Sequence, residues 1–410
     1  MKIPRNNLQL VTRWENSDHN SLVTELRSKP LRQIEATEIL VRIESVPAHG
    51  SFWLATDPSA VHPRIGEFLL DGEFVFGNGG VGCVISCGSL VKGVVPGDYV
   101  SIFGHYACEH HDCAPCHKYG RYVECSYGEG KILGHGGGAL DGTFAQFAIL
   151  PLGTWIRCFK ASQFPTDRDL IPFMYSFLVA DVRNALSGVK LQKEKNNVLL
   201  FGAGLSGHIA VALLLSAFPQ EIRIIVADPD DDNLQSIKRL APDMIRAVSL
   251  PNDPLGHINS PTQDGSRNDL HVGSSLLARN IDEFFPQKRA DLIFECSSGD
   301  STNYWANTLV LRPRTVVILF GFGLKNLVLS PELLQTSGLE IRTSRGVGDR
   351  ENMEEAIGFI KETGYKIINK FILDRAKRFD SLQVFLDYAL GIGKSQGDQI
   401  PRAISYICPE

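Results

Sequence analysis

Short apolar runs alternate with longer apolar or amphipathic segments from residue 197 onward, which predicts strands alternating with helices. The run 197–201 has the length of a buried strand, and the segment 205–217 has the length of a helix. The alternation continues through 222–227, 230–240, 244–250, 290–296, 303–311, 315–320 and 339–343. Strands and helices in this order favour a parallel sheet that is covered by helices.

The pattern of residues 1–150 is different, because apolar and polar positions alternate there over short stretches. Ile39 to Val46 alternates as a half-buried strand does. Turns that contain Gly and Pro separate further candidate strands at 81–86, 99–103 and 144–150. Many short strands joined by such turns favour a small barrel-like or sandwich-like domain.

The remaining segments connect and complete these two parts. Residues 171–191 have a helical pattern, and residues 251–278 are polar and rich in Gly, Pro, Ser and Asn, which indicates a surface insertion. Near the end of the chain, 351–364 and 381–390 predict helices. Residues 402–407 predict an edge strand that returns to the first domain.

A glycine motif joins the strand 197–201 to the helix that follows it. Its residues are Gly202, Ala203, Gly204, Leu205, Ser206 and Gly207. In such a unit the first glycine makes the tight turn, the second lets the backbone approach a pyrophosphate, and the third lets the helix pack on the strand. The helix N-terminus offers N–H groups to the phosphates. We therefore predict a dinucleotide site, and the alternative is a glycine-rich turn that binds nothing.

Asp228 ends the next predicted strand, about 20 residues beyond the last glycine, where a ribose-binding acid is expected. Its carboxylate would accept hydrogen bonds from the ribose hydroxyls. Asp230, Asp231 and Asp232 follow, and these acids would repel a 2′-phosphate. The sequence therefore predicts NAD (NADH) as the cofactor.

Composition and charge narrow the class of protein further. The chain has 410 residues, 43% of them hydrophobic and 21% charged, with a net charge of −5. This length suggests two or three domains, and the charge does not favour nucleic acid or an acidic membrane surface. Residues 1–20 lack the apolar core of a signal peptide, and we find no apolar stretch that predicts a transmembrane helix. We expect a cytoplasmic protein.

The chain contains nine cysteines, of which Cys108, Cys113, Cys116 and Cys125 form a cluster. An odd total and a clustered pattern fit a reduced compartment and a metal site better than a disulfide framework.

Several sequence motifs occur along the chain in an order that resembles a known family. They are VKGVVPGDYV, the cysteine cluster, DGTFAQF, the glycine motif with Asp228, ADLIFECSSG and TVVILFGFG. In this order they resemble the medium-chain dehydrogenase/reductase superfamily, in its zinc alcohol dehydrogenase-like branch. The resemblance implies an α/β fold with a GroES-like β-rich substrate domain and a doubly wound Rossmann nucleotide-binding domain. It places the substrate domain at 1–172, completed by 345–410, and the NAD-binding domain at 173–344.

The resemblance also implies cofactor contacts after two later strands. The strand 290–296 would end near a ribose of the cofactor, the strand 315–320 near its carboxamide, and a later arginine near a phosphate. The residues concerned are Cys296, Ser297, Phe320, Gly321, Phe322 and Arg345. An ordinary surface arginine is the alternative interpretation of Arg345.

The residues that would hold a catalytic zinc in this family are replaced. The family's ligands are a Cys, a His and usually another Cys, whereas the matching positions here are His49, Asn78 and Phe177. Asn and Phe are poor zinc ligands, and one His cannot hold the metal alone. We therefore predict an oxidoreductase without catalytic zinc.

Without this metal, other groups must move the proton. His49 titrates near neutral pH and Ser51 supplies a hydroxyl relay, so this pair can exchange a proton with an alkoxide. Asp181 lies four residues after Phe177, at a position that faces the nicotinamide in the family, and a carboxylate there would raise the pKa of His49. The alternatives are a cleft-wall histidine for His49 and a helix cap or ion-pair partner for Asp181.

The cysteine cluster is similar to the family's structural zinc lobe, which has the spacing C-x2-C-x2-C-x7-C. Cys113, Cys116 and Cys125 match its last three cysteines with one extra residue. For the first ligand, His110 has the right spacing and Cys108 is two residues early. Either would complete one structural zinc site per chain. Four reduced cysteines without a metal are the alternative.

Three functions stay open at this point. The first is an NAD(H)-dependent oxidoreductase without catalytic zinc that acts on the hydroxyl or carbonyl group of a small molecule. The second is a reductase of an activated C=C bond, of the enone or quinone type. The third is a catalytically silent NAD-binding protein. By analogy with the family we expect a homodimer, and we expect no nucleic-acid or membrane partner.

Overall fold

A computed structural model describes residues 5–14, 22–47, 73–108, 110–126, 131–134, 140–189, 196–218, 222–250, 276–297, 315–321, 338–343, 346–364, 376–379, 381–392 and 403–406. The chain divides into two compact units, residues 1–180 with 346–410 and residues 181–345. It passes from one unit to the other twice, after Ala180 and after residue 345.

The first boundary lies later in the chain than the predicted division after residue 172. The reason is that the segment before Ala180 packs on the first unit. Ser101 Oγ donates to the carbonyl of Phe173 at 2.7 Å, and a Cβ on Gly79 would lie 2.5 Å from the ring of Phe177.

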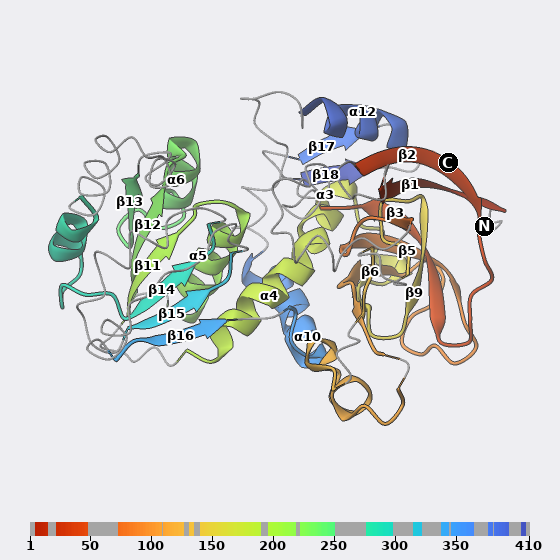
Figure 1. The fold of residues 1–410 in the computed structure, drawn as a ribbon, viewed down its shortest axis with the longest axis horizontal. Helices are drawn as coiled ribbons and strands as arrows, with labels where there is room; N and C mark the ends of the chain where they lie inside the picture. Colours follow the sequence, from red (N-terminus) through yellow and green to blue (C-terminus); the bar gives the residue numbers. More distant parts are fainter. Residues whose placement is uncertain are drawn as a thin grey trace. The chain divides into compact units, whose positions relative to one another are not determined.

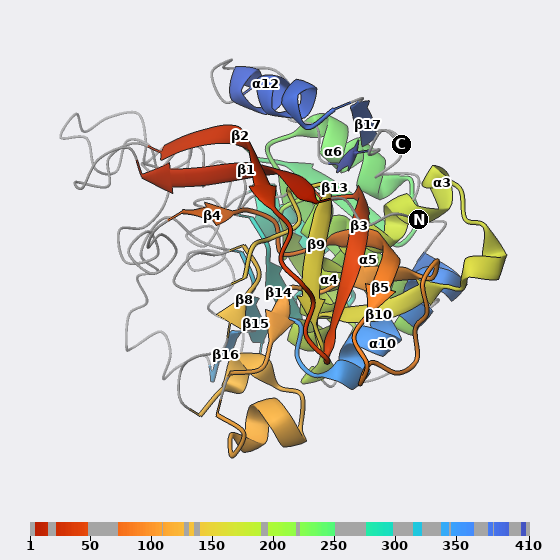
Figure 2. The ribbon, with the colours of Figure 1, turned by 90° about the vertical axis from the view of Figure 1, so that its right-hand side faces the viewer.

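The first unit is built on antiparallel strands. Its five-stranded sheet has the order β10-β6-β5-β3-β9, and β9, β3 and β5 lie side by side in Figure 2. The strands are β3 (Glu38–Ser45), β5 (Gly80–Cys87), β6 (Tyr99–Ile102), β9 (Phe147–Pro151) and β10 (Trp155–Phe159). A three-stranded sheet, β2-β1-β4, consists of β1 (Asn6–Trp14), β2 (Leu22–Pro30) and β4 (Phe74–Val75). This architecture agrees with the predicted β-rich domain.

The end of the chain closes the core of this unit, as the sequence predicted. The helix α12 (Leu382–Ile392) lies beside β1 and β2 (Figure 1). Its Phe385 is fully buried, with its ring centroid 5.5 Å from that of Phe144. The strands β17 (Ala376–Phe379) and β18 (Ala403–Tyr406) pair in parallel.

Short elements complete the first unit. They are β7 (His105–Tyr106), β8 (Lys131–Ile132), α3 (Asp167–Leu170), α10 (Arg350–Phe359) and the helical turns Ala114–Lys118, Tyr122–Glu124, Ala161–Gln163, Ile171–Tyr175 and Ile360–Gly364. The helix α4 (Ser176–Ser187) continues across the first boundary between the units. It is shorter than the predicted helix 171–191, because the segment begins as a 3-10 turn.

The second unit contains a parallel sheet of the order β13-β12-β11-β14-β15-β16, which Figure 1 shows strand by strand. The strands are β11 (Asn197–Phe201), β12 (Arg223–Asp228), β13 (Ile245–Ser249), β14 (Leu292–Glu295), β15 (Val316–Leu319) and β16 (Glu340–Thr343). The helices include α5 (Leu205–Ala217), α6 (Asp231–Lys238) and residues 276–284. This strand order is that of a doubly wound Rossmann fold, so the predicted fold class is confirmed.

Some of the predicted elements lie outside the described residues or begin at a different residue. The predicted helix 303–311 and residues 251–275 of the predicted insertion lie outside the described residues. The strand predicted to begin at Phe144 begins at Phe147, because the N–H of Phe144 donates to the carbonyl of Phe76 instead. In the described part of the chain, every helix is too short or too polar to cross a membrane.

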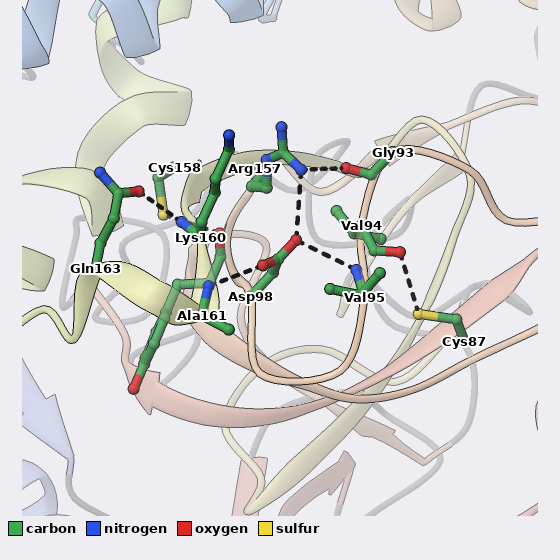
Figure 3. A network of polar contacts seen from close by, with 11 residues as sticks. Cys87, Gly93, Val94, Val95, Asp98, Arg157, Cys158, Lys160, Ala161 and Gln163 are labelled. Atoms are coloured by element: carbon green, nitrogen blue, oxygen red, sulfur yellow. Dashed lines mark hydrogen bonds and ion pairs between the residues drawn. The ribbon is translucent and has the colours of Figure 1, made fainter.

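A buried carboxylate fixes the turn between β5 and β6 (Figure 3). Asp98 is 2% exposed, and its Oδ1 accepts from the N–H of Ala161 at 2.9 Å. Its Oδ2 accepts from the N–H of Val95 at 3.2 Å and lies 3.5 Å from Nη1 of Arg157. Arg157 also donates to the carbonyl of Gly93 at 2.8 Å. One side chain therefore ties the turn 93–98 to β10 and to the turn that follows it.

We expect the substitution Asp98→Ala to lower the free energy of unfolding by about 2–3 kcal/mol, since it leaves two N–H groups and a guanidinium without their acceptor. Thermal unfolding measures the effect. Lys92→Ala, at an exposed position of the same turn, is the control and should leave the melting temperature unchanged. Equal melting temperatures for both variants would contradict the assigned role of Asp98.

Candidate functional site

The glycine turn lies between β11 and α5, as the spacing predicted. Gly202 has a φ of 99°, a conformation that favours glycine, and its N–H donates to the carbonyl of Ala227 at 2.9 Å. A Cβ on Gly202 would lie 2.9 Å from the amide nitrogen of Ser297. A Cβ on Gly207 would collide with the carbonyl of Gly202. The first and third glycines are therefore required by the packing of strand, turn and helix.

Asp228 ends β12 and contacts the glycine turn directly. Its Oδ2 accepts from the N–H of Ala203 at 2.5 Å, and its Oδ1 accepts from the N–H of Asp230 at 2.8 Å. Asp230 in turn caps α6 by accepting from the N–H of Asn233 at 2.9 Å. The carboxylate is thus held beside the turn, where the sequence placed a ribose-binding acid.

The N-terminus of α5 is suited to an anion. Gly204 is its N-cap and makes no side-chain capping bond, and the first turn contains no acid. The first N–H groups of a helix without a side-chain cap can donate to phosphate oxygens. Buried His208 fixes the start of this helix, because Nδ1 lies 3.0 Å from the carbonyl oxygen of Gly204 and Nε2 lies 3.3 Å from Ser236 Oγ.

The ends of β14 and β15 adjoin the same turn. Ser297 contacts the position of Gly202, and Gly321 lies so close to the carbonyl of Ser297 that a Cβ would collide with it. Buried Glu295 fixes this edge, since its Oε1 accepts from the N–H of Ser297 at 2.8 Å and from its Oγ at 2.5 Å. The backbone carbonyl of Glu295 accepts from the N–H groups of Phe320 at 2.8 Å and Gly321 at 2.9 Å.

Sequence reasoning missed Glu295. The available signal was a single acid within the apolar run 290–296. Such an acid needs hydrogen-bond partners when it is buried, and its partners here are the loop residues that follow the strand.

The thiol of Cys296 serves as a hydrogen-bond donor at this edge. Its Sγ lies 3.0 Å from the carbonyl oxygen of Phe201 and 3.3 Å from that of Gly202. Burial raises the pKa of Cys296 well above its usual value, so the thiol stays protonated. Two of the predicted cofactor contacts, Phe322 and Arg345, lie outside the described residues.

Four cysteine side chains converge between β7 and β8. The sulfur atoms of Cys108, Cys113, Cys116 and Cys125 all lie within 4.8 Å of one another, and those of Cys113 and Cys125 are 3.9 Å apart. The structure thus gathers Cys108, and not His110, with the other three. In a tetrahedral zinc site with Zn–S bonds of about 2.3 Å, neighbouring sulfurs are about 3.8 Å apart. The donor set and its spacing fit a closed zinc site.

The protonation of these thiols also suits a metal. Burial opposes the ionisation of Cys113, but hydrogen bonds from the N–H groups of Cys116 and Ser126 and from the thiols of Cys116 and Cys108 together outweigh it and lower the pKa of this thiol to about 6. Burial raises the pKa of Cys116 to about 12. Cys113 therefore ionises more readily than Cys116, and a thiol that binds a metal loses its proton.

Two of the three positions matched to catalytic-zinc ligands are close together in the first unit. Asn78 directly precedes Gly79, which packs against the ring of Phe177, and Phe177 is 5% exposed. The third position, His49, lies outside the described residues together with Ser51. Within the described residues, the four cysteines are the group of His, Cys, Asp and Glu side chains that could hold a metal.

Asp181 is the first residue of the second unit and lies within α4. Its Oδ1 is buried and accepts no hydrogen bond from the described residues. Burial raises the pKa of Asp181 to about 7. The group is therefore an acid that is about half protonated at neutral pH, rather than the permanent carboxylate that the sequence suggested.

Comparison with solved structures establishes the fold over the whole length. A short chain alcohol dehydrogenase from E. coli CFT073, solved with NADH, superposes with a TM-score of 0.69 at 18% identity, covering 99% of this chain and 100% of that chain. An acetophenone reductase from Geotrichum candidum, solved with NAD, gives a TM-score of 0.69 at 15% identity, covering 100% and 99%.

Sequence comparison identifies a domain in the first unit. Residues 35–160 match the alcohol dehydrogenase GroES-like domain. The L-threonine 3-dehydrogenase of Pyrococcus horikoshii is 30% identical over 174 residues, 42% of this chain and 44% of that protein. Residues 35–160 are therefore an alcohol dehydrogenase GroES-like domain.

The similarity to the curated relatives is partial. The L-threonine 3-dehydrogenase of Bacillus velezensis is 27% identical over 251 residues, 60% of this chain and 64% of that protein. The match therefore spans less than two thirds of the length of these relatives. The matched GroES-like domain contains Asn78 and the four cysteines.

We expect elemental analysis to find about one zinc per chain in the native protein, and less than about 0.2 in Cys116→Ser, because three thiolates do not close a structural site. Cys87→Ser changes a free cysteine in β5 and is the matched control, which should keep its zinc. Full zinc content in Cys116→Ser would show that the ligand set is wrong.

We expect Asp181→Asn to raise the melting temperature relative to the native protein at about pH 8 more than at about pH 5, by at least about 2 °C. The raised pKa means that the folded state keeps the proton while the unfolded chain ionises near 3.8. The stability contributed by the neutral acid is therefore lost as the pH rises through about 7. Asn does not ionise and avoids this loss. A difference that is constant with pH would contradict the buried acid.

Proposed function

We propose that this protein is an NAD(H)-dependent oxidoreductase that transfers hydride between nicotinamide and the hydroxyl or carbonyl group of a small molecule. The observation that carries this proposal is the position of Asp228, whose carboxylate is hydrogen-bonded to the N–H of Ala203 in the glycine turn. Relatives named as L-threonine 3-dehydrogenases support a hydroxyl substrate. Similar structures that contain NADH or NAD support the cofactor.

The residues of the second unit fit this cofactor. The uncapped start of α5 would receive the pyrophosphate, and Asp228 would accept hydrogen bonds from the adenosine ribose. The edge formed by Ser297 and Gly321 would border the remainder of the molecule. When bound, the nicotinamide supplies or accepts the hydride. Asp230, Asp231 and Asp232 disfavour the 2′-phosphate of NADPH.

We further propose that the reaction proceeds without a catalytic zinc. Asn78 and Phe177 supply no zinc ligand of the usual kind, and the ring of Phe177 packs on Gly79 instead. In the family, the two matching positions bind the same metal and must therefore lie close together. The contact of Phe177 with Gly79, the neighbour of Asn78, supports our alignment of Asn78 and Phe177 with the zinc ligands.

The remaining chemical task is the movement of one proton. Reduction of a carbonyl forms an alkoxide, which needs a proton, and oxidation of a hydroxyl releases one. His49 with Ser51 as relay is our first candidate for this step. Asp181 is the second candidate, because an acid with a pKa of about 7 can donate or accept a proton at neutral pH.

We also propose one structural zinc per chain, held by the four cysteines, which would stabilise the loop between β7 and β8. A homodimer and a cytoplasmic location stay predictions from the sequence. The edge position of β16 supports a dimer, since an edge strand presents unpaired backbone groups to a second copy.

The function is tested by a panel of secondary alcohols, β-hydroxy amino acids, ketones and enones, with NADH binding followed by fluorescence in the same samples. We expect turnover of alcohols or ketones. We expect His49→Ala to lower kcat by about 100-fold or more while NADH affinity stays within about twofold, because the histidine moves a proton and does not hold the cofactor.

Other outcomes of the substrate panel would favour a different function or mechanism. Reduction of enones alone would favour the C=C reductase. NADH binding without turnover over the whole panel would favour a silent NAD-binding protein. Unchanged turnover in His49→Ala would remove the histidine from the mechanism. A second zinc per chain that is needed for turnover would contradict zinc-free chemistry.

A further inference from the structure

The two connections between the units differ in backbone conformation. The first lies inside α4, a continuous helix over Ser176–Ser187. The second leads from residue 345 into α10 and contains Gly346 with a φ of 66° and Gly348 with a φ of 74°. Glycines in the left-handed region are found where the backbone makes sharp turns.

Asn352, in the first turn of α10, joins these two connections. Its Nδ2 donates to the carbonyl of Ala180 at 2.7 Å and to the carbonyl of Val347 at 2.7 Å. Ala180 is the last residue of the first unit on the first connection, and Val347 follows the second connection directly. Both Ala180 and Val347 are completely buried. The two N–H groups of one carboxamide are thus shared between the two places where the chain changes units.

Asn352 is itself held in place by its own helix. Its backbone N–H donates to Oδ1 of Asp349, the N-cap of α10, at 3.0 Å. Oδ2 of Asp349 lies 3.9 Å from Nε of Arg121, which lies between Cys116 and Cys125 in the chain. The carboxamide therefore extends from a capped helix end that lies beside Arg121.

We propose that Asn352 is a positioning residue that fixes the two connections relative to each other and orients the peptide group that leads into Asp181. The consequence for catalysis rests on the proposed function. The cofactor contacts that we assign lie in the second unit, and none of them includes Asn352. Loss of the carboxamide should therefore lower turnover while it leaves NADH affinity unchanged.

Asp is the informative substitution, because it keeps the size of the side chain and removes both donors. In Asn352→Asp a carboxylate faces two carbonyl oxygens, which it cannot satisfy. Asn7→Ala is the matched control. The Asn7 side chain also makes two bonds to the backbone, since Nδ2 donates to the carbonyl of Phe147 at 2.7 Å and Oδ1 accepts from its N–H at 3.0 Å. These bonds lie in the β-sheet region of the first unit, away from either connection.

Amide hydrogen exchange of the protein without added cofactor tests the proposal directly. In Asn352→Asp we expect exchange to rise by about tenfold or more in peptides that cover 176–189 and 346–353, with the strands of both units unchanged. In Asn7→Ala we expect a rise in peptides that cover 5–14 and 146–151 instead. Unchanged exchange at 176–189, or an equal rise over the whole chain, would overturn the proposal.

Kinetics then give the functional consequence. With the substrate found by the panel, we expect kcat of Asn352→Asp to fall by about tenfold and the NADH Kd to stay within about twofold, whereas Asn7→Ala keeps both. Failure of the native protein to bind NADH would contradict the proposed function. It would not affect the interpretation of the hydrogen-exchange experiment, which uses no cofactor. NADH binding in the native protein with unchanged kcat in Asn352→Asp would contradict the positioning role alone.

Discussion

The hydrogen bond from the N–H of Ala203 to the carboxylate of Asp228 is the contact on which the proposed cofactor site depends. It joins the turn after β11 to the end of β12, and it requires the parallel register that pairs Phe201 with Ala227. The N–H of Gly202 donates to the carbonyl of Ala227 in the same ladder. The sheet, the glycine turn and the start of α5 are thereby held in one geometry, and a ribose acceptor lies beside a phosphate donor.

The first unit supports a different kind of conclusion. The ring of Phe177 packs against Gly79 next to Asn78, and Asn78 and Phe177 stand at two of the positions that we align with the ligands of a catalytic zinc. The four cysteines lie elsewhere in the same unit and are arranged as ligands. In our proposal an aromatic side chain and an amide stand where the family has zinc ligands, and neither is a ligand of the usual kind. This contrast is the physical basis for a proposal of hydride transfer without catalytic zinc.

The sequence predicted those features that depend on local spacing. The glycine turn, the strand ends and Asp228 follow from short segments in which neighbouring residues determine the backbone. The choice between Cys108 and His110 could not be made in this way, because it depends on the path of the chain from β7 into the lobe. The strands β1 and β2 were also missed, although Leu8, Leu10 and Thr12 alternate with other positions. Asn352 could not be found, because its partner Ala180 is 172 residues away in sequence.

The central claim is that the second unit forms a site for NAD(H), and equilibrium titration with NADH and NADPH tests it most directly. The account predicts that NADH binds at least about tenfold more tightly than NADPH. It also predicts that Asp228→Asn reduces this preference by more than Asp231→Asn does, because Asp228 is the acid that contacts the glycine turn whereas Asp231 lies in the first turn of α6. Equal affinity for the two nucleotides, or tighter binding of NADPH, would contradict the assigned role of Asp228. Absence of binding by either nucleotide would contradict the site itself.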